Sequence, residues 1–513
     1  MHLRDLLKNV EPLHIEGNLS GNISSVCYDS RSCKKNSLFV AIPGLKADGH
    51  HYIPEAVERG ATVIVCERNY TPPSGVTALR VSDSRRALGI LSRNFFQDPS
   101  SRLCLVGVVG TNGKTTVTYL LESILKAAGC RVGVLGTVNY RFNRKILPAP
   151  NTTPESYDMQ KILRTMVDEG VTHVIAEISS HAVDLKRVDD CAFDMGIFTN
   201  LSQDHLDYHG TMEGYFLAKK RFFDDVLPAG NKRRKFMIVN EDDPWGQRLL
   251  RDVRTDVPSR TFGVEHPCDV TAGPFNLSLE GIKGRLQTAS FSFDIASPLI
   301  GKFNLYNILA SATAALSLNI PETCIRMGIT KLKKVPGRLE KISRAGEPGV
   351  FVDYAHTDDA LRRVLENLSA FRKKMLITVF GCGGDRDRGK RPLMGQAAVS
   401  LSHVAIVTSD NPRTENPLSI IEDIEKGIQD TSVRKVPPEA LRRGMKEKTY
   451  TVIPDREKAI ETAVSLADPS DIVLIAGKGH ENYHIIGETR MPFDDKEIAK
   501  EILKNRRGKG GVN

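Results

Sequence analysis

The stretch from Gly107 to Leu120, GVVGTNGKTTVTYL, has the residue types and spacing of a phosphate-binding loop. An apolar run and a glycine turn lead to Lys114 and Thr115, where a helix would begin. Backbone N–H groups at such a helix N-terminus bind phosphate oxygens, the lysine adds a cation, and the threonine hydroxyl is a magnesium ligand. The standard spacing would place a glycine five residues before Gly113, but Val108 stands there, so the loop is a variant form.

A glycine turn without a ligand is the alternative, and the adjacent Lys-Thr-Thr run argues against it. After the loop, apolar side chains recur at helical spacing, and Gly129 is placed to end the helix. We therefore expect the nucleotide phosphates to be bound by Gly110, Thr111, Asn112, Gly113, Lys114, Thr115 and Thr116.

Two further side chains stand where a magnesium ion beside this loop could be bound. Glu177 is at the end of an expected strand, in EISSH, and a carboxylate there could reach the metal. His205, in NLSQDHLDYHG, follows the next expected strand among Asp204, Asp207 and His209. A lone histidine is more often structural, but this setting favours a metal role for His205.

Lys219, in GYFLAKKRFF, has aromatic residues one helical turn before it and one turn after it. It therefore lies on an apolar helix face, whereas Lys220 and Arg221 point elsewhere and have the pattern of ordinary solvated charges. Burial favours the neutral amine, and a neutral amine can react with carbon dioxide to give a carbamate, which is a magnesium ligand. The alternative is an ammonium group that extends past the apolar face to solvent, and the pattern alone favours that alternative.

The elements that must position these side chains alternate between short apolar β-branched runs and segments of helical period. This alternation predicts parallel sheets with crossover helices. Residues 261–293 are differently patterned and predict antiparallel hairpins, and the Pro-Gly break in residues 334–340 fits a domain boundary. The strand candidates are residues 103–109, 172–178, 194–200 and 235–240, followed by 349–356, 374–381, 403–409 and 471–477.

Length and composition limit the classes of protein that remain. A chain of 513 residues is too long for one core and suggests about three units. No apolar run approaches the ~20 residues that span a bilayer, and the N-terminus lacks a secretory apolar block, so we expect a cytoplasmic protein without membrane insertion. Nine scattered cysteines without a CxxC pair argue against a disulfide framework or a zinc site.

The net charge of +9, from 71 Lys and Arg against 62 Asp and Glu, could attract an anion, although solvated surface is the commoner reason for such a balance. The clearest basic run, residues 504–509, reads as a polar tail. It contains no interleaved aromatic residues of the kind that bind single-stranded nucleic acid. We expect no nucleic acid partner.

Ordered motifs along nearly the whole chain resemble the Mur ligase family, and most closely its members that add meso-diaminopimelate. These motifs are GTNGKTT, NTTP, EISSHAV, NLSQDHLDYHG, AKKRFF, GKFNLYNILA, VPGRLE, VDYAHT, GCGGDRDRGKRPLM, DNPRTENP and AGKGHE. The resemblance implies an α/β protein of three domains: a smaller N-terminal α/β domain for the UDP end of the substrate (1–100), a central P-loop ATPase with a mostly parallel sheet (101–335), and a C-terminal Rossmann-like domain that admits the amino acid (336–513).

The resemblance also implies the reaction. In the family, ATP phosphorylates a carboxylate, here the γ-carboxylate of D-glutamate in UDP-N-acetylmuramoyl-L-alanyl-D-glutamate. The amine of the incoming amino acid attacks the acyl phosphate, and the tetrahedral intermediate collapses to amide, phosphate and ADP. A carboxylate is a poor electrophile until one oxygen becomes a good leaving group, and the charge that develops requires concentrated positive charge.

Roles for individual residues follow from the resemblance. Lys114 and Thr115 serve the phosphates and the first magnesium, Glu177 and His205 are metal ligands, and Lys219 is the carbamylated position, in preference to the solvent-exposed alternative. Further nucleotide contacts fall on Asn304, Asn307, Arg338 and Asp353. Contacts to the UDP-muramoyl substrate fall on Ser30, Asn151, Thr152, Thr153, Ser179 and Arg187. We expect a monomer.

The choice of amino acid depends on three expected C-terminal strands that end at Gly381, Ser409 and Gly477, because ligands bind at the carboxyl ends of such strands. Arg386 and Arg413 can bind a carboxylate. Asp410, Asn411 and Glu481 can hold an ammonium group, and Gly477 leaves a backbone carbonyl accessible. meso-Diaminopimelate carries both groups at its far end, whereas L-lysine would leave Arg413 without an anion. Surface ion pairing is the alternative role for each charge.

Three other functions remain open. The first is the same ligase acting on L-lysine. A folylpolyglutamate-synthase-like ligase would share the central and C-terminal domains, but it would not need the N-terminal DSR motif or the DNPR motif. A P-loop nucleotide switch would not need Arg386, Arg413 and Glu481 together.

Overall fold

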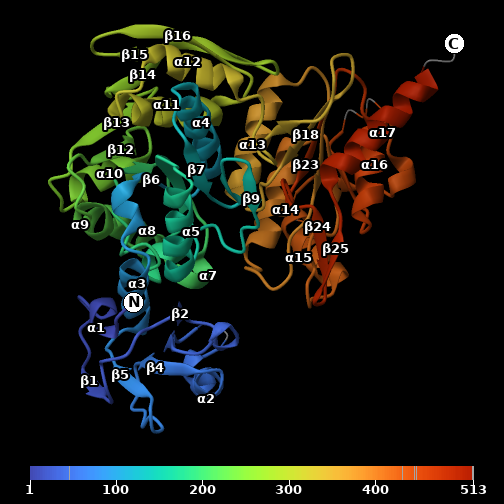
Figure 1. Cartoon of the computed structure of the whole chain (residues 1–513). Helices are drawn as coiled ribbons and strands as arrows, with labels where there is room; N and C mark the ends of the chain where they lie inside the picture. Colours follow the sequence, from blue (N-terminus) through green and yellow to red (C-terminus); the bar gives the residue numbers. More distant parts are fainter. Residues whose placement is uncertain (45–46, 430, 444, 446, 511–513) are drawn as a thin grey trace.

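A computed structural model of the chain describes every residue except 45–46, 430, 444, 446 and 511–513, and it describes the backbone but not the side chains of 508–510. Three sheets follow one another along the chain, each covered by helices (Figure 1). Most neighbouring strands are parallel, which confirms the predicted α/β class. No helix in the described part of the chain is both long enough and apolar enough to cross a membrane.

The first sheet has the strand order β1-β5-β4-β3-β2. Only the edge pair β1 and β5 is antiparallel. Its strands are β1 (His14–Glu16), β2 (Ser25–Cys27), β3 (Ser37–Val40), β4 (Ala61–Cys66) and β5 (Thr77–Arg80). Its helices are α1 (Leu3–Leu6), α2 (Ile53–Glu58) and α3 (Ser84–Phe95), with 3₁₀ turns η1 (Ser30–Ser32), η2 (Gly49–Tyr52) and η3 (Pro99–Arg102).

The second sheet has eleven strands in the order β16-β15-β14-β13-β12-β11-β6-β10-β7-β8-β9. Its parallel centre contains all four strands expected before residue 241. The strands are β6 (Cys104–Val109), β7 (Val132–Leu135), β8 (Tyr140–Phe142), β9 (Lys145–Leu147), β10 (His173–Ile178), β11 (Met195–Phe198), β12 (Phe236–Asn240), β13 (Ser259–Gly263), β14 (Val270–Ser278), β15 (Gly281–Thr288) and β16 (Ser292–Ser297).

The helices of this second unit cover both faces of the sheet (Figure 1). They are α4 (Lys114–Ala127), α5 (Ser156–Asp168), α6 (Ser180–Asp184), α7 (Leu206–His209), α8 (Met212–Arg221), the π-helical turn η4 (Phe222–Val226), α9 (Leu227–Ala229), α10 (Pro244–Asp252), α11 (Lys302–Ser317) and α12 (Glu322–Lys331).

The predicted hairpin region is correct only in part. β14, β15 and β16 are antiparallel neighbours, as expected, but they extend to Ser297. β13, which lies within the expected hairpins, pairs in parallel with β12 and with β14. β13 therefore extends the parallel part of the sheet, and its five residues, SRTFG, do not distinguish the two directions.

Helix α4 starts at the phosphate loop and ends as predicted. Gly129 lies just after the helix with φ +80°, and its N–H donates to the Lys126 carbonyl at 3.1 Å. The predicted apolar stripe is fully buried and consists of Val117, Leu120, Leu121, Ile124 and Leu125.

Helix α12 packs against α4 at backbone distance. A Cβ on Gly328 would lie 2.4 Å from the Cα of Ile124. The Ser123 hydroxyl donates to the Gly328 carbonyl at 2.7 Å. The absence of a side chain at Gly328 therefore sets the distance between α12 and the helix that carries the phosphate loop.

The third sheet has the order β17-β18-β23-β19-β20-β22-β21, with only β17 antiparallel to its neighbour, and β24 and β25 form a separate hairpin. The strands are β17 (Glu340–Lys341), β18 (Gly349–Asp353), β19 (Leu376–Phe380), β20 (Val404–Val407), β21 (Arg434–Lys435), β22 (Thr449–Val452), β23 (Ile472–Ala476), β24 (Tyr483–Ile486) and β25 (Thr489–Pro492). The helices are α13 (Asp358–Phe371), α14 (Lys390–Leu401), α15 (Pro417–Gln429), η5 (Pro438–Ala440), α16 (Arg456–Leu466) and α17 (Asp495–Gly510).

The predicted C-terminal strand ends meet at one edge of this third sheet. β23, β19 and β20 are parallel neighbours, so Gly477, Gly381 and the segment after Val407 emerge on the same side. The basic run at 504–509 belongs to the backbone of helix α17 and is not an irregular tail. We propose unit boundaries of 1–100, 101–335 and 336–513, which fall between the three sheets.

Candidate functional site

The phosphate loop connects the central strand β6 to helix α4, and two glycines allow its shape. Gly113 has φ +87°, and a Cβ there would lie 2.4 Å from the side-chain oxygen of Asn307. A Cβ on Gly110 would lie 1.9 Å from the Thr199 hydroxyl. The loop is therefore a cradle that a side chain at either glycine would fill. The Thr111 and Asn112 N–H groups donate to Asn200, at 2.9 and 3.0 Å, so the N–H groups that can converge on a ligand are those at the start of α4.

Two lysines meet at the carbonyl oxygen of Gly110. The Lys114 ammonium donates to it at 2.9 Å, and the Lys219 ammonium donates to it at 3.0 Å. Lys114 also donates to the Thr111 carbonyl at 2.9 Å. Burial lowers the pKa of Lys114 and lowers that of Lys219 well below its usual range, and the charge of Lys114 lowers the pKa of Lys219 further.

Only 1% of Lys219 is exposed, so its amine does not extend to solvent, which overturns the interpretation that the pattern alone favoured. Its ammonium lies 4.5 Å from the centre of the Tyr215 ring. The expectation of solvated neighbours is also wrong. Lys220 is buried and ion-paired with Asp224, and Arg221 is partly buried and ion-paired with Asp189. The helix continues as the π-helical turn η4, which carries Asp224 one turn after Lys220, whereas Asp189 lies on a segment that the local pattern did not connect to Arg221.

The Glu177 carboxylate lies beside the first turn of α4. Its Oε2 accepts hydrogen bonds from the Thr115 hydroxyl at 3.1 Å and from the Thr137 hydroxyl at 2.8 Å. The Thr137 N–H donates to Oε1 at 3.2 Å. A buried carboxylate next to a threonine hydroxyl offers the hard oxygen ligands that magnesium prefers, so these residues fit that ion.

His205 lies on the same cavity in a left-handed backbone conformation, with φ 55°. Its ring centre is 4.9 Å from that of His181 and 6.1 Å from that of Tyr215. Burial lowers the pKa of His205 to about 4, despite the opposing charge of Asp204, so the imidazole is neutral. Among the described residues, no group of three His, Cys, Asp or Glu side chains is arranged to hold a metal.

A cavity of about 540 Å³ joins the phosphate loop to residues of the third unit. Asn112 of the loop donates to the Asp359 carboxylate of α13 at 3.4 Å across this cavity. The predicted site residues that line it are Thr111, Asn112, Gly113, Lys114, Thr115, Thr116, Thr152, Glu177, Ser179, His205, Asn307, Arg338 and Asp353. Those outside its lining are Ser30, Gly110, Asn151, Thr153, Arg187, Lys219, Asn304 and the residues expected to bind the amino acid.

Arg338 connects the third unit directly to the loop. Its guanidinium donates to the Thr115 hydroxyl at 3.2 Å and lies 4.5 Å from the centre of the Tyr354 ring. Asp353, at the end of β18, accepts N–H bonds from Leu339 at 2.5 Å and Ala355 at 2.8 Å. Burial raises the pKa of Asp353, and the charge of Arg338 opposes that shift.

Asn304 and Asn307 lie on consecutive turns of α11. The Asn307 amide donates to the Asn304 side-chain oxygen at 3.0 Å, and Asn304 donates to the Ile300 carbonyl at 2.8 Å. Asn307 lines the cavity, whereas Asn304 does not line it and contacts Asn307 through this hydrogen bond.

The predicted contacts to the UDP-muramoyl substrate form two groups. The Thr153 hydroxyl donates to the Glu177 carbonyl at 2.8 Å and accepts the Ser179 N–H at 3.0 Å. Arg187 donates to the Thr153 carbonyl at 3.2 Å, and its guanidinium lies 3.2 Å from Glu155. These residues hold the segment after β9 against the end of β10.

The remaining members of this set lie further apart. The Thr152 and Thr137 hydroxyls are 3.1 Å from each other, and the Asn151 carbonyl accepts the Tyr140 hydroxyl at 2.5 Å. Ser30 lies in the first unit, where its hydroxyl donates to Glu55 at 2.7 Å. The contact between Arg85 of the first unit and Glu155, at 3.3 Å, connects the two units near this group.

Four of the residues expected to bind the amino acid lie together at the edge of the third sheet. The Asn411 amide donates to the Glu481 carboxylate at 2.8 Å, and the Asn411 N–H donates to Asp410 at 2.7 Å. A Cβ on Gly477 would lie 2.5 Å from the Asp410 carboxylate. Burial and the Asp410 charge raise the pKa of Glu481.

The two predicted arginines flank Gly383. A Cβ there would lie 2.9 Å from the Arg413 guanidinium and 3.9 Å from Cγ of Arg386. Arg413 has φ 51° and donates to the Gly384 carbonyl at 2.7 Å. Arg386 is exposed at this edge. Arg413 is close enough for its charge to act on Glu481, and Arg386 lies on the other side of Gly383.

Sequence reasoning did not assign a role to Lys478, Arg456 or His356. Lys478 and Arg456 are buried beside Asp410. His356 lines the cavity, and burial lowers its pKa to about 4. Lys478 and His356 lie within quoted motifs, AGKGHE and VDYAHT, but Arg456 has no local signal because its partners are far away in the chain.

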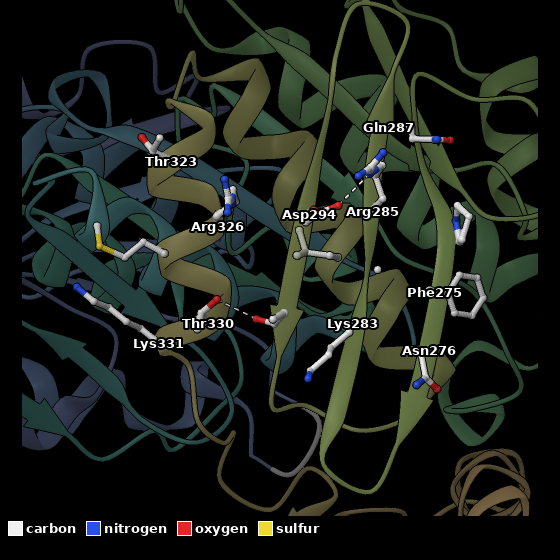
Figure 2. A pocket seen from close by; sticks show the side chains of 15 residues that line it. Phe275, Asn276, Lys283, Arg285, Gln287, Asp294, Thr323, Arg326, Thr330 and Lys331 are labelled. Carbon is white, nitrogen blue, oxygen red and sulfur yellow. Dashed lines mark hydrogen bonds and ion pairs between the residues drawn. The ribbon is translucent and has the colours of Figure 1, made fainter.

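A second, more open cavity of about 1280 Å³ lies away from this site, between helix α12 and the hairpin strands β14, β15 and β16 (Figure 2). The Arg285 guanidinium pairs with Asp294 at 2.9 Å, and Thr330 donates to the Ala296 carbonyl at 2.9 Å. None of the predicted site residues lines this cavity.

Family models match three consecutive parts of the chain. The Mur ligase family catalytic domain matches residues 22–96, the Mur ligase middle domain matches residues 108–315, and the Mur ligase glutamate ligase domain matches residues 337–479.

Individual proteins are similar over the full length. The chain is 44% identical over 511 residues to the UDP-N-acetylmuramoyl-L-alanyl-D-glutamate--2,6-diaminopimelate ligase of Geobacter metallireducens, which covers 99% of this chain and 100% of that protein. A solved structure of a ligase with the same name has a TM-score of 0.69 at 31% identity and covers 99% of both chains. A folylpolyglutamate synthase structure from Mycobacterium tuberculosis has a TM-score of 0.60 at 17% identity and covers 77% of this chain and 92% of its own.

Proposed function

The chain belongs to the Mur ligase family, and from this premise we propose that it is an ATP-dependent ligase that adds meso-diaminopimelate to the D-glutamate γ-carboxylate of UDP-N-acetylmuramoyl-L-alanyl-D-glutamate. The reaction is a step in peptidoglycan precursor synthesis. ATP transfers its γ-phosphoryl group to the carboxylate, and ADP leaves. The amine then attacks the acyl carbon, the C–O bond to phosphate breaks, and a proton is released as the amide forms.

One observation carries this proposal. The cavity of about 540 Å³ is lined by the phosphate loop, by Ser179 and Thr152 from the expected acceptor site, and by Arg338 of the third unit. A nucleotide switch would need only the first of these. A ligase needs the nucleotide next to the acceptor carboxylate, and the shared lining of this cavity supports that proposal, while the residues expected to bind the amino acid lie outside it.

The chain's own residues supply the positive charge that phosphoryl transfer requires. Lys114 lies at the start of α4, where it can bind the β- and γ-phosphate oxygens, and the loop N–H groups add further donors. Arg338 approaches the same point from the opposite wall of the cavity. Asn307 and Asp353 would orient the rest of the nucleotide.

Magnesium, when bound, would neutralise charge on the phosphate oxygens. Thr115 and Glu177 fit that ion through their adjacent oxygens, and His205 offers a neutral imidazole on the same cavity. Lys219 fits the carbamate proposal because its amine is buried beside a second ammonium group, and both features favour the neutral form that reacts with carbon dioxide.

The amino acid would enter at the edge of the third sheet. Asp410 and Glu481 would hold the distal ammonium group of meso-diaminopimelate, and Arg413 with Arg386 would bind its distal carboxylate. L-lysine lacks that carboxylate and would leave both arginines without a partner. We further propose that the enzyme is a cytoplasmic monomer.

The experiment that tests the function is the product mass after incubation with ATP, magnesium and UDP-N-acetylmuramoyl-L-alanyl-D-glutamate, with meso-diaminopimelate and L-lysine in separate tubes. The proposal requires a diaminopimelate adduct and no lysine adduct. A lysine adduct alone would keep the chemistry and overturn the specificity. Phosphate release without either adduct would reject the ligase in favour of a nucleotide switch.

A further inference from the structure

Lys478, in AGKGHE, is a fully buried cation to which the proposed function gives no role. It is 0% exposed, and its ammonium donates to the Asn411 side-chain oxygen at 2.7 Å and to the Tyr483 carbonyl at 2.9 Å. It also lies 3.7 Å from the Asp410 carboxylate. A buried lysine is costly unless its charge is used, so its contacts indicate what it does.

The contact with Lys478 decides which way the Asn411 amide points. The Asn411 oxygen accepts from Lys478 and from the Ile485 N–H at 3.0 Å, so both of its acceptor positions are used. Its NH₂ group is therefore the part that faces Glu481, at 2.8 Å. A reversed amide would direct two donors at the Lys478 ammonium and an oxygen at a carboxylate.

The neighbouring cation does not replace Lys478 in this arrangement. Arg456 is also fully buried, but it binds the Asp495 carboxylate through two hydrogen bonds, of 2.8 and 2.6 Å. Its distance to Asp410 is 3.9 Å. Lys478 is thus the nearer cation to Asp410, while one carboxylate already offsets the charge of Arg456.

We propose that Lys478 is a positioning residue for the amino-acid site: it fixes the Asn411 amide and keeps Asp410 and Glu481 together as a pair of carboxylates that accepts one incoming ammonium group. This inference rests on the proposed function and adds a residue to it. Two carboxylates at one site repel each other, and a cation beside them allows both to stay ionised. Without Lys478, one carboxylate would take up a proton and the site would lose half its charge.

The pKa shift of Asp410 agrees with this arrangement, whereas the pKa of Glu481 stays above its usual range. Burial raises the pKa of Asp410, but the charges of Lys478 and Arg456 outweigh burial and hold it below its usual range. For Glu481, burial and the Asp410 charge raise the pKa, and Lys478 opposes them. The charged and titratable groups that face the two carboxylates are Lys478, Arg456, Arg413, Tyr354, Tyr483 and His484.

The test compares Lys478→Met, Lys478→Gln and Lys478→Arg in the full chain, with Lys458→Met on the exposed face of α16 as the matched control. The KM for meso-diaminopimelate is expected to rise about tenfold or more in Lys478→Met, which corresponds to the loss of one charged hydrogen bond. The KM for ATP and the kcat at saturating amino acid should stay near wild type. Lys478→Gln, which can still donate to Asn411, should recover part of the loss.

A pH profile separates positioning from a merely structural role. Wild-type binding of meso-diaminopimelate weakens at low pH as the two carboxylates take up protons. In Lys478→Met the remaining carboxylates lose their nearest cation, their pKa values rise, and binding should weaken at a higher pH than in wild type. An unchanged profile, or equal losses for ATP and amino acid, would overturn the proposal.

A double-mutant cycle that combines Lys478→Gln with Asn411→Ser covers the case in which Lys478→Met folds poorly. If Lys478 acts through Asn411, the two substitutions will be far from additive in the Kd for meso-diaminopimelate. Additive effects would refute the positioning role. Failure of the proposed function differs in kind, because the wild-type enzyme would then form no diaminopimelate adduct at all.

Discussion

The ammonium groups of Lys114 and Lys219 donate to the same oxygen, the Gly110 carbonyl, at 2.9 and 3.0 Å. Two buried cations on one acceptor are unfavourable unless one of them is neutral. Burial lowers the pKa of both amines, and that of Lys219 falls well below its usual range, so Lys219 is the amine that loses its proton more readily.

Lys219→Met should therefore abolish turnover without unfolding the protein. A buried amine replaced by an apolar side chain of similar length is often neutral or stabilising, so the melting temperature should hold or rise. We expect kcat to fall by roughly two to three orders of magnitude, the range for loss of one charge-stabilising group.

Lys219→Ala leaves room for a small carboxylic acid and tests the carbamate itself. Acetate or formate should restore part of its activity, and intact mass in bicarbonate buffer should show one added carbon dioxide on wild type only. A folded Lys219→Ala enzyme that binds ATP and is not rescued by any short acid would reject the carbamate.

Gly113→Ala should weaken ATP binding. The left-handed backbone at φ +87° costs a non-glycine residue about 1–2 kcal/mol, and the new Cβ would lie 2.4 Å from the Asn307 side chain. Gly129→Ala is the matched control, because φ is +80° but nothing lies within 4 Å of its Cβ. Isothermal titration should show lost ATP affinity in the first variant only, and similar loss in both would mean that backbone strain alone is responsible.

Arg413→Ala should reduce use of meso-diaminopimelate by roughly 10- to 100-fold in kcat/KM, the value of one hydrogen-bonded charge. The KM for ATP should change little, because Arg413 does not line the nucleotide cavity. Arg388→Ala, which removes an exposed arginine paired with Asp423, serves as the control. Steady-state kinetics with each substrate varied in turn measures the separation, and parallel losses would count against the specificity argument.

Arg456 and Asp495 should behave as a buried ion pair. Both are 0% exposed, so removing one partner leaves an uncompensated charge and should cost about 3–5 kcal/mol. Arg456→Met and Asp495→Leu should each lower the urea midpoint of the C-terminal unit, and the double variant should recover much of that loss. A double variant less stable than either single one would show that the pair is net stabilising.

The local sequence pattern was sufficient to predict most helices and strands and the position of the phosphate loop. The β-branched runs, the glycine turn and the apolar stripe of α4 are each specified within about twenty residues, so their positions could be predicted. Pattern was insufficient for Lys219 and Lys220, because two adjacent lysines look alike until a partner such as Asp224 or Gly110 is placed beside them. The parallel pairing of β13 likewise depends on β12, which the five residues of β13 do not encode.

The sequence predicts which residues form the amino-acid site, but it does not predict the hydrogen bonds that connect them. Asn411 and Glu481 are both predicted to bind the ammonium group, and the structure adds a hydrogen bond between them that the sequence did not predict. Lys478 and Arg456 could not be recognised as buried, because a lysine or arginine in a polar motif is usually exposed and only the folded chain excludes water from it.

Gly328 does not line the nucleotide cavity, but it packs against α4, the helix that begins at Lys114. A single methyl group at this position would push α12 off Ile124 and tilt the helix that begins at the phosphate loop. Substitutions at Gly328 are therefore expected to be temperature-sensitive, with activity at low temperature and none on warming. A mutational survey limited to residues that contact substrate would miss such variants.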